Sequence, residues 1–547
     1  MKDSRKSNYC QKSNYCQKSN CCSKKCIKKS EECWEERKEK IDKKSFCKNI
    51  CLTPILIEPN DSQTIVLSKP GYYCLSSDLT FQPLTSGQIA IVINSSNVIL
   101  DLNYKTLSQG NEQAGAIGIS VNEQSNILIK NGFITGFRAI GILANRIDNL
   151  TLDLLNVTRC GDPDVANTAF GGVAITKSKE VQIFNSKFRF NTGGQAVAIS
   201  ATGVTVNNCN FDDNLGSNTS FFGPGFAFGL NFSATAPPFE EPSRDVYIRN
   251  STFDRNNGVG ITIGLVFLNF GDITNPPRNI IIEDCTANNI FSRGSSPAEI
   301  SGITILGDDV VVRRCQATSF RSEAPLVQIN PMEYGGKNVL IESCIVGDVV
   351  GTAVGPNAVI SGFNVEALFA AQLDQDIVFK SCQATNITNN GTGRTAGFIS
   401  VHEGTGFPIS GISAAFGSIF EDCIAADVHN NFGTGAGFIL ASQRDLTVKD
   451  CISNRNDIGI LIQDQVDTPP SSVGIIEDNI LVGNSNFGIQ DLTGVNYAYL
   501  RNEVRDSGVN YDGLPANTPI RSWVIGQPPG PEVAGPQIDN LSINSVV

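Results

Sequence analysis

A short pattern of apolar and polar positions returns six times between Ile280 and Cys451. If the first residue of each unit is position 0, then positions 0 and 2 are mostly apolar, position 3 is mostly charged and position 5 is cysteine. The six cysteines are Cys285, Cys315, Cys344, Cys382, Cys423 and Cys451. Apolar residues with a period of two predict a β-strand with one buried face. Because this strand returns every 28 to 41 residues, it predicts a solenoid of stacked coils.

The same unit can be followed on both sides of the cysteine-bearing stretch. Its position-0 residues are Val98, Ile127, Leu150, Val181, Val204, Val246, Ile280, Val310, Val339, Ile377, Ser418, Leu446, Gly474 and Tyr497. A second strand follows in many units, as in residues 260–263 and 459–462, and corners rich in Asn and Gly connect the strands. The sequence therefore predicts an all-β fold, a single-stranded right-handed parallel β-helix of about fourteen coils over residues 98–507.

Three flanking regions differ from the coils. Residues 52–97 contain short strands and are expected to be an N-terminal cap, because a bare first coil would expose a strand edge. Residues 508–547 are rich in proline and are expected to form a C-terminal cap or tail. Residues 1–51 hold 15 Lys and Arg against 7 Asp and Glu, and 8 of the 17 cysteines. Their low complexity predicts a disordered basic tail.

Charge and composition restrict the classes of partner. Residues 52–547 carry 27 Lys and Arg against 47 Asp and Glu, so nucleic acid is not expected as a partner of this acidic body. No apolar run of about 18 residues is present, and we expect no membrane span. The tail lacks Cys-x-x-Cys pairs, so no metal or other cofactor is predicted; intermolecular disulfides are the alternative for its thiols. No apolar region of a standard secretory signal follows the basic N-terminus, and a virion or cell-surface location is favoured.

Positions 3 and 5 carry the most informative side chains. From the sixth coil, position 3 alternates between cation and anion in the order Arg249, Glu283, Arg313, Glu342, Lys380, Glu421, Lys449 and Glu477. If register is kept, each charge lies between opposite charges, which disfavours a slip by one coil. The cysteines at position 5 are expected to point inward. Their spacing of about 4.8 Å permits disulfides, but parallel side chains favour buried free thiols.

Coil length varies mainly between the second strand and the next position 0. The insertions expected there are residues 231–244, 269–278, 330–337, 366–375, 402–417 and 464–472. Because they leave the same corner of successive coils, we expect them to line one side of the solenoid and to form its binding face. The candidate ligand-binding residues near this side are Phe222, Phe226, Phe239, Glu240, Glu241 and Asp245.

Candidate catalytic chemistry is sparse. Glycoside hydrolysis needs two carboxylates at a controlled spacing, yet the aspartate pairs at 212–213 and 308–309 are explained by turns. The one acid–base pair to test is His402 with Glu403, inside an insertion.

The repeat resembles the right-handed parallel β-helix superfamily, the pectin-lyase-like fold, over residues 89–507; residues 454–460, Asn-Arg-Asn-Asp-Ile-Gly-Ile, are an example. Segments 70–75, 97–103, 523–526 and 539–543 look like β-helix proteins of giant DNA viruses and amoeba-associated bacteria. The resemblance implies the fold. The catalytic motifs of pectinases and pectate lyases are absent, so it implies no site residue.

These observations lead to two hypotheses. The first is a non-enzymatic structural, surface or virion protein that binds glycans or protein partners through its insertions. The alternative is a polysaccharide lyase, hydrolase or epimerase acting in the same groove. Homotrimerisation along the solenoid is a further hypothesis about assembly.

Overall fold

The computed structural model describes residues 55–58, 63–111, 115–162, 171–193, 195–216, 227–232, 242–258, 262–267, 275–292, 298–355, 358–365, 375–400, 417–441, 446–463, 474–493, 497–513 and 520–525. All of them belong to one compact unit, Pro54–Val547. The expected tail, residues 1–51, lies outside the described residues.

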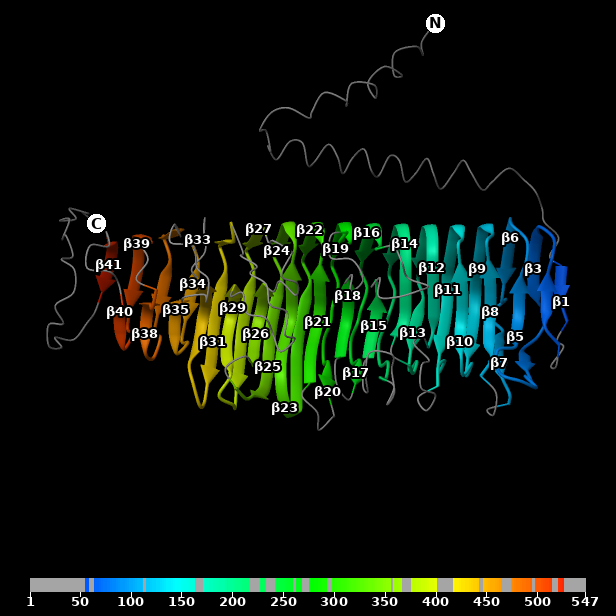
Figure 1. Ribbon diagram of the computed structural model, residues 1–547, viewed down its shortest axis with the longest axis horizontal. Helices are drawn as coiled ribbons and strands as arrows, with labels where there is room; N and C mark the ends of the chain where they lie inside the picture. Colours follow the sequence, from blue (N-terminus) through cyan, green and yellow to red (C-terminus); the bar gives the residue numbers. More distant parts are fainter. Residues whose placement is uncertain are drawn as a thin grey trace, which may run out of the picture. The chain divides into compact units, whose positions relative to one another are not determined.

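The described elements are β-strands that pair in parallel as three ladders, and Figure 1 shows strands of successive coils side by side in chain order. The first ladder contains β1 (Ile55–Ile57), β3 (Gly71–Leu75), β6 (Val98–Asp101), β9 (Ser125–Thr135), β11 (Asp148–Thr158), β12 (Val173–Phe184), β14 (Gln195–Asn207), β16 (Arg244–Arg249), β19 (Arg278–Glu283), β22 (Asp308–Arg313), β24 (Lys337–Glu342), β27 (Gln375–Lys380), β30 (Ile419–Glu421), β33 (Leu446–Lys449), β36 (Gly474–Glu477), β39 (Ala498–Arg505) and β41 (Ile520–Ile525).

The second ladder follows at positions 5 to 12 and also uses the C-terminal parts of β9, β11 and β39. It contains β4 (Leu79–Phe81), β7 (Thr106–Gln109), β13 (Lys187–Arg189), β17 (Asn257–Gly258), β20 (Phe291–Ser292), β23 (Gln316–Gly335), β25 (Ile345–Ala353), β28 (Gln383–Asn389), β31 (Ile424–Asn430), β34 (Ile452–Asn454) and β37 (Ile480–Val482).

The third ladder corresponds to the predicted second strands and also uses parts of β12, β14 and β23. It contains β2 (Ile65–Leu67), β5 (Ile89–Ile93), β8 (Ile117–Asn122), β10 (Ile140–Asn145), β15 (Ala227–Asn231), β18 (Thr262–Phe267), β21 (Ala298–Leu306), β26 (Val359–Val365), β29 (Arg394–Ser400), β32 (Gly435–Ala441), β35 (Ile458–Gln463), β38 (Phe487–Asp491) and β40 (Val509–Asp512).

The register of the first ladder confirms the alignment of the repeat. Val98 pairs with Ile127, which pairs with Leu150, and Ile280 pairs with Val310. Parallel stacking begins before Val98, because β1 pairs with β3 and β3 with β6. It also continues past residue 507, where β40 pairs with β38 and β41 with β39.

The core lies inside the coils, where positions 0 and 2 meet inward residues of the third ladder. Phe379 stacks on Phe420 with ring centroids 5.1 Å apart, and Phe398 of the third ladder stacks on Phe438 at 4.9 Å. The two stacks touch edge to face, since the centroids of Phe379 and Phe398 are 6.0 Å apart. Aromatic burial and these contacts stabilise the interior of successive coils together.

Residues with left-handed backbone at three repeated positions form the bends of each coil. Positions −1, 4 and 9 have φ between +47° and +74° in coil after coil, as at Asn126, Asn131 and Gly136. Most residues there are Asn, Asp or Gly, which tolerate this conformation. Their amides also bond between coils: Asn126 Nδ2 donates to Asn97 Oδ1 at 2.9 Å, and Asn149 Nδ2 donates to Asn126 Oδ1 at 2.9 Å.

The alternating charges of position 3 form one column in register, as predicted. The charge column consists of Arg249, Glu283, Arg313, Glu342, Lys380, Glu421, Lys449 and Glu477, and each residue pairs with the next. Lys380 Nζ lies 2.9 Å from Glu421 Oε2, and Arg313 forms an ion pair with Glu283. Because these groups are partly exposed, each pair contributes little free energy, and the column acts mainly on register.

The position-5 cysteines are buried free thiols, which confirms the prediction. Cys382 Sγ donates to the Ile341 carbonyl oxygen at 3.4 Å, and Asn479 Nδ2 makes the equivalent bond to Val448 at 3.0 Å. Burial raises the pKa of the Cys209 thiol to about 12. The Cys209 thiol therefore stays protonated. At position 5 a thiol takes the place of an Asn side chain in a ladder of inward hydrogen bonds.

One expected insertion is wrong. Residues 330–335 continue strand β23, and Met332 pairs with Ile303 and with Phe363. Met332 and Tyr334 are fully buried, so this segment supplies inward side chains to the core. Pro331 lies inside this strand, and a proline within an apolar run normally argues against a strand.

Candidate functional site

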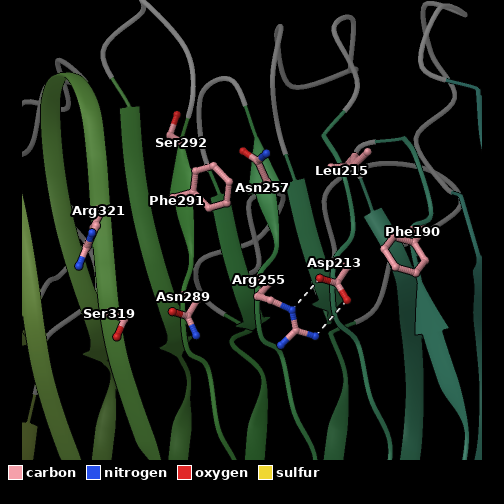
Figure 2. Close-up of a pocket in the computed structure, with 10 residues that line it drawn as sticks. All are labelled: Phe190, Asp213, Leu215, Arg255, Asn257, Asn289, Phe291, Ser292, Ser319 and Arg321. Atoms are coloured by element: carbon pink, nitrogen blue, oxygen red, sulfur yellow. Dashed lines mark hydrogen bonds and ion pairs between the residues drawn. The ribbon is translucent and has the colours of Figure 1, made fainter.

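A groove lies on the outside of the second ladder, at positions 9 to 12 of five consecutive coils. Its volume is about 740 Å³. Figure 2 shows the residues that line it: Phe190, Asp213, Leu215, Arg255, Asn257, Asn289, Phe291, Ser292, Ser319 and Arg321.

The repeat itself arranges these side chains in two rows. Position 9 supplies Phe190, Asp213, Arg255, Asn289 and Ser319, all with positive φ. Position 11 supplies a second row, in which Leu215 pairs with Asn257, Asn257 with Phe291, and Phe291 with Arg321. Paired residues on neighbouring parallel strands lie about 4.8 Å apart, so the rows cross successive coils as continuous strips.

Phe190 is an unusual residue for the left-handed bend. Its φ is 58°, and its side chain is 44% exposed. A bulky residue in this conformation costs about 1–2 kcal/mol relative to ordinary backbone, and its exposure recovers little burial energy. The Arg189 guanidinium lies 5.1 Å from the centre of the ring, and Leu215 is also 43% exposed. The groove therefore presents an aromatic and an aliphatic surface to solvent.

Asp213 is held by two arginines. Arg255 Nε donates to Asp213 Oδ1 at 2.7 Å and Arg255 Nη2 to Oδ2 at 3.0 Å, while Arg189 Nε donates to Oδ2 at 3.1 Å. Burial alone would raise the pKa of the Asp213 carboxyl, but the bonds and charges of both arginines outweigh it and hold the pKa below its usual range. The hydrogen bond to Asp213 and its charge raise the pKa of Arg255. Neither group is suited to exchange a proton near neutral pH.

Two of the polar side chains that line the groove are buried. Asn257 is 8% exposed and Ser292 is 1% exposed. Within the described part of the chain, Asn257 Oδ1 and Ser292 Oγ have no hydrogen-bond partner. An unsatisfied buried polar group costs about 1–3 kcal/mol, and most such groups in proteins are bonded. Both side chains line the groove, and Figure 2 shows Asn257 and Ser292 beside Phe291.

The residues predicted from sequence lie elsewhere. Phe222, Phe226, Phe239, Glu240, Glu241, His402 and Glu403 fall outside the described residues. Asp245 is described: it is exposed at position −1, where its Oδ1 accepts a hydrogen bond from Asn279 Nδ2 at 2.8 Å. It thus belongs to the amide ladder of a different bend and does not line the groove.

The aspartate pairs at 212–213 and 308–309 make turn contacts, as the sequence predicted. Asp212 Oδ1 accepts bonds from Thr252 Oγ1 at 2.7 Å and from the Asp254 amide at 2.9 Å. Asp309 accepts a bond from Asn338 at 3.0 Å. Asp213 also lines the groove, which the sequence analysis missed.

A histidine lies farther along the second ladder, at position 11. His429 Nδ1 is 3.1 Å from Asp457 Oδ1, and Asp457 Oδ2 accepts bonds from the Asn430 and Gly435 amides. This pair fixes a turn, and His429 is not among the residues that line the groove. No group of three His, Cys, Asp or Glu side chains among the described residues could hold a metal ion. Among the described residues there is no apolar helix of the length needed to cross a membrane.

The sequence comparison agrees with this architecture. Residues 164–295 match the family model described as a right handed beta helix region. The fold is a right-handed parallel β-helix. A comparison with curated proteins gives no significant match.

Several solved structures are similar to this chain at low sequence identity. The Streptococcus pneumoniae surface protein and adhesin PfbA is 11% identical, with 83% of this chain and 92% of that chain covered and a TM-score of 0.37. The Dettilon tailspike protein is 9% identical, with coverage of 86% and 61% and a TM-score of 0.25. The A-module of the Azotobacter vinelandii mannuronan C-5 epimerase AlgE4 is 13% identical, with coverage of 86% and 91% and a TM-score of 0.22.

Proposed function

We propose that this chain is a non-catalytic surface or virion protein that binds a glycan in the groove at positions 9 to 12. The observation that carries the proposal is the mixed lining of the groove, in which Phe190, Leu215 and Phe291 line the same hollow as the polar side chains of Asn289 and Ser319. A sugar offers hydroxyl groups at its edges and C–H groups on its faces. Hydroxyls would bond the Asn289 and Ser319 side chains, while Phe190, Leu215 and Phe291 would contact the apolar faces.

The chemistry of the lining residues supports binding rather than turnover. Glycoside hydrolysis uses two carboxylates, one as acid and one as nucleophile or base. Among the described lining residues Asp213 is the one carboxylate, and two arginines occupy it. Of the two lining arginines, Arg255 is bound to Asp213 and is a poor base. Polysaccharide lyase, hydrolase or epimerase activity is the alternative that the experiment must exclude.

A glycan array followed by calorimetry on the purified full chain tests this proposal. Phe190→Ala is expected to weaken binding of the selected oligosaccharide about tenfold, or ~1.4 kcal/mol. Phe133→Ala is the matched control, because Phe133 is 42% exposed and lies outside the groove. Binding that is equally insensitive to both changes would place the ligand elsewhere. Release of reducing ends or unsaturated products from the bound glycan would instead establish the enzymatic alternative.

A further inference from the structure

The outer surface of the first ladder has the charge order of a self-complementary interface. The charge column contains eight residues that alternate in sign from Arg249 to Glu477. When an alternating column of even length is reversed end to end, every member faces a member of opposite sign. Reversal pairs Arg249 with Glu477 at the ends and Glu342 with Lys380 at the centre.

An apolar row runs beside this column at position 1. It consists of Ile281, Val311, Leu340, Val378 and Ile419, which pair in register. All five are partly exposed in the described chain, and Ile475, farther along the row, is 40% exposed. An apolar strip beside charges is the composition of a protein interface, with an apolar centre and a polar edge.

We infer that this face binds a second copy of the chain in an antiparallel dimer. The twofold axis lies in the interface, parallel to the strands, between the coils of Val339 and Ile377. This axis keeps each position opposite the same position while it reverses the order of the coils. Position 3 therefore meets position 3 with opposite charges, and position 1 meets position 1 with Leu340 against Val378.

The same column argues against association with the two stacks parallel. In a dimer with parallel stacks, the twofold axis runs along the stack and each coil lies level with the same coil of the other copy. Where the two charge columns face each other, Arg313 of one copy would then lie against Arg313 of the other. Like charges in contact cost several kcal/mol in an interface. The antiparallel arrangement has one unfavourable contact at position 4, next to the charge column, where Asp284 of one copy lies opposite Asp450 of the other. Both are already compensated, since Arg314 Nε bonds Asp284 at 2.7 Å and Lys449 Nζ lies 3.8 Å from Asp450.

The size of the face sets the expected strength. Eight coils about 4.8 Å apart and four residues about 3.3 Å long give a face of roughly 500 Å² per copy, or roughly 1,000 Å² in total. This is the lower limit for a specific interface, so the dimer should form and dissociate with concentration. The face uses positions 0 to 3 and the groove uses positions 9 to 12, so both copies keep an open groove.

Sedimentation equilibrium of the full chain over a hundredfold range of concentration tests the dimer. The mass is expected to rise from 58.6 kDa toward twice that value. Leu340→Lys is expected to raise the dissociation constant at least tenfold. Leu128→Lys is the control, because Leu128 is also partly exposed at position 1 but lies outside the eight coils. Thermal unfolding must show both variants folded.

Two further measurements fix the orientation. Glu342→Lys alone is expected to weaken the dimer, and adding Lys380→Glu is expected to restore it. Carbodiimide cross-linking of isotopically labelled with unlabelled chains is expected to join Lys380 of one copy to Glu342 of the other. A mass of one chain throughout, a mass of three chains, or a dimer unaffected by Leu340→Lys would each overturn the inference.

Discussion

The first ladder and the groove are built from the same coils, but they use their outward positions in opposite ways. At position 3 of the first ladder, each charge has opposite charges above and below it in register. At positions 9 to 12, Phe190 occupies a left-handed bend, and Asn257 and Ser292 leave buried atoms unbonded. The difference separates scaffold from candidate site: the outward charges of the column pair with one another and hold register, whereas the outward side chains of the groove line a hollow with exposed aromatic, aliphatic and polar groups.

The largest expected difference between these regions concerns phenylalanine. Phe379→Ala removes a fully buried ring that stacks on Phe420 and is expected to cost about 3–5 kcal/mol of unfolding free energy. Phe190→Ala is expected to change stability by less than about 0.5 kcal/mol, because that ring is already exposed. Denaturant unfolding of both variants measures the contrast. Equal losses would show that Phe190 belongs to the scaffold.

A smaller effect is expected from breaking the charge column. Glu421→Lys places a third cation between Lys380 and Lys449, in register with both, and is expected to destabilise the chain by about 1 kcal/mol at low ionic strength. In ~1 M salt the loss should nearly disappear, because the screening length falls to about 3 Å. A loss that persists in high salt would mean that packing at Glu421, rather than charge, holds the register.

The smallest expected effect is the pH dependence at Asp213. Its carboxyl pKa is lower in the folded chain than the usual value of about 3.9. Asp213 therefore stabilises the fold above that usual value, and this stabilisation is lost as the pH falls through the lowered pKa. Asp213→Asn is expected to unfold more easily than the unchanged chain at pH 6, with the gap closing below about pH 4. A gap of constant size across this range would rule out the ion pairs as its cause.

The groove shows where sequence reasoning stopped. Aligning positions 3 and 5 predicted the charge column and the inward thiols, because each depends only on residues that recur within one unit. The same alignment at position 9 would have shown Phe190 where Asn, Asp and Gly prevail. It would not have shown that Asn257 and Ser292 are buried without partners, because that depends on what packs around them. The expected insertions pointed to the corner between the second strand and the next position 0, and most of the candidate residues there lie outside the described residues.

By itself, the sequence determined the strand period, the parallel stack and its register. The physical reason is that alternating apolar residues bury one face of a strand, and a repeated strand buries its remaining edges only against its neighbours. The tertiary structure decided the site. Phe190 and Arg321 are 131 residues apart in the chain and line one groove because three left-handed bends in each coil bring positions 9 and 11 back to the same face. That return depends on backbone geometry accumulated over five coils, which no single stretch of sequence contains.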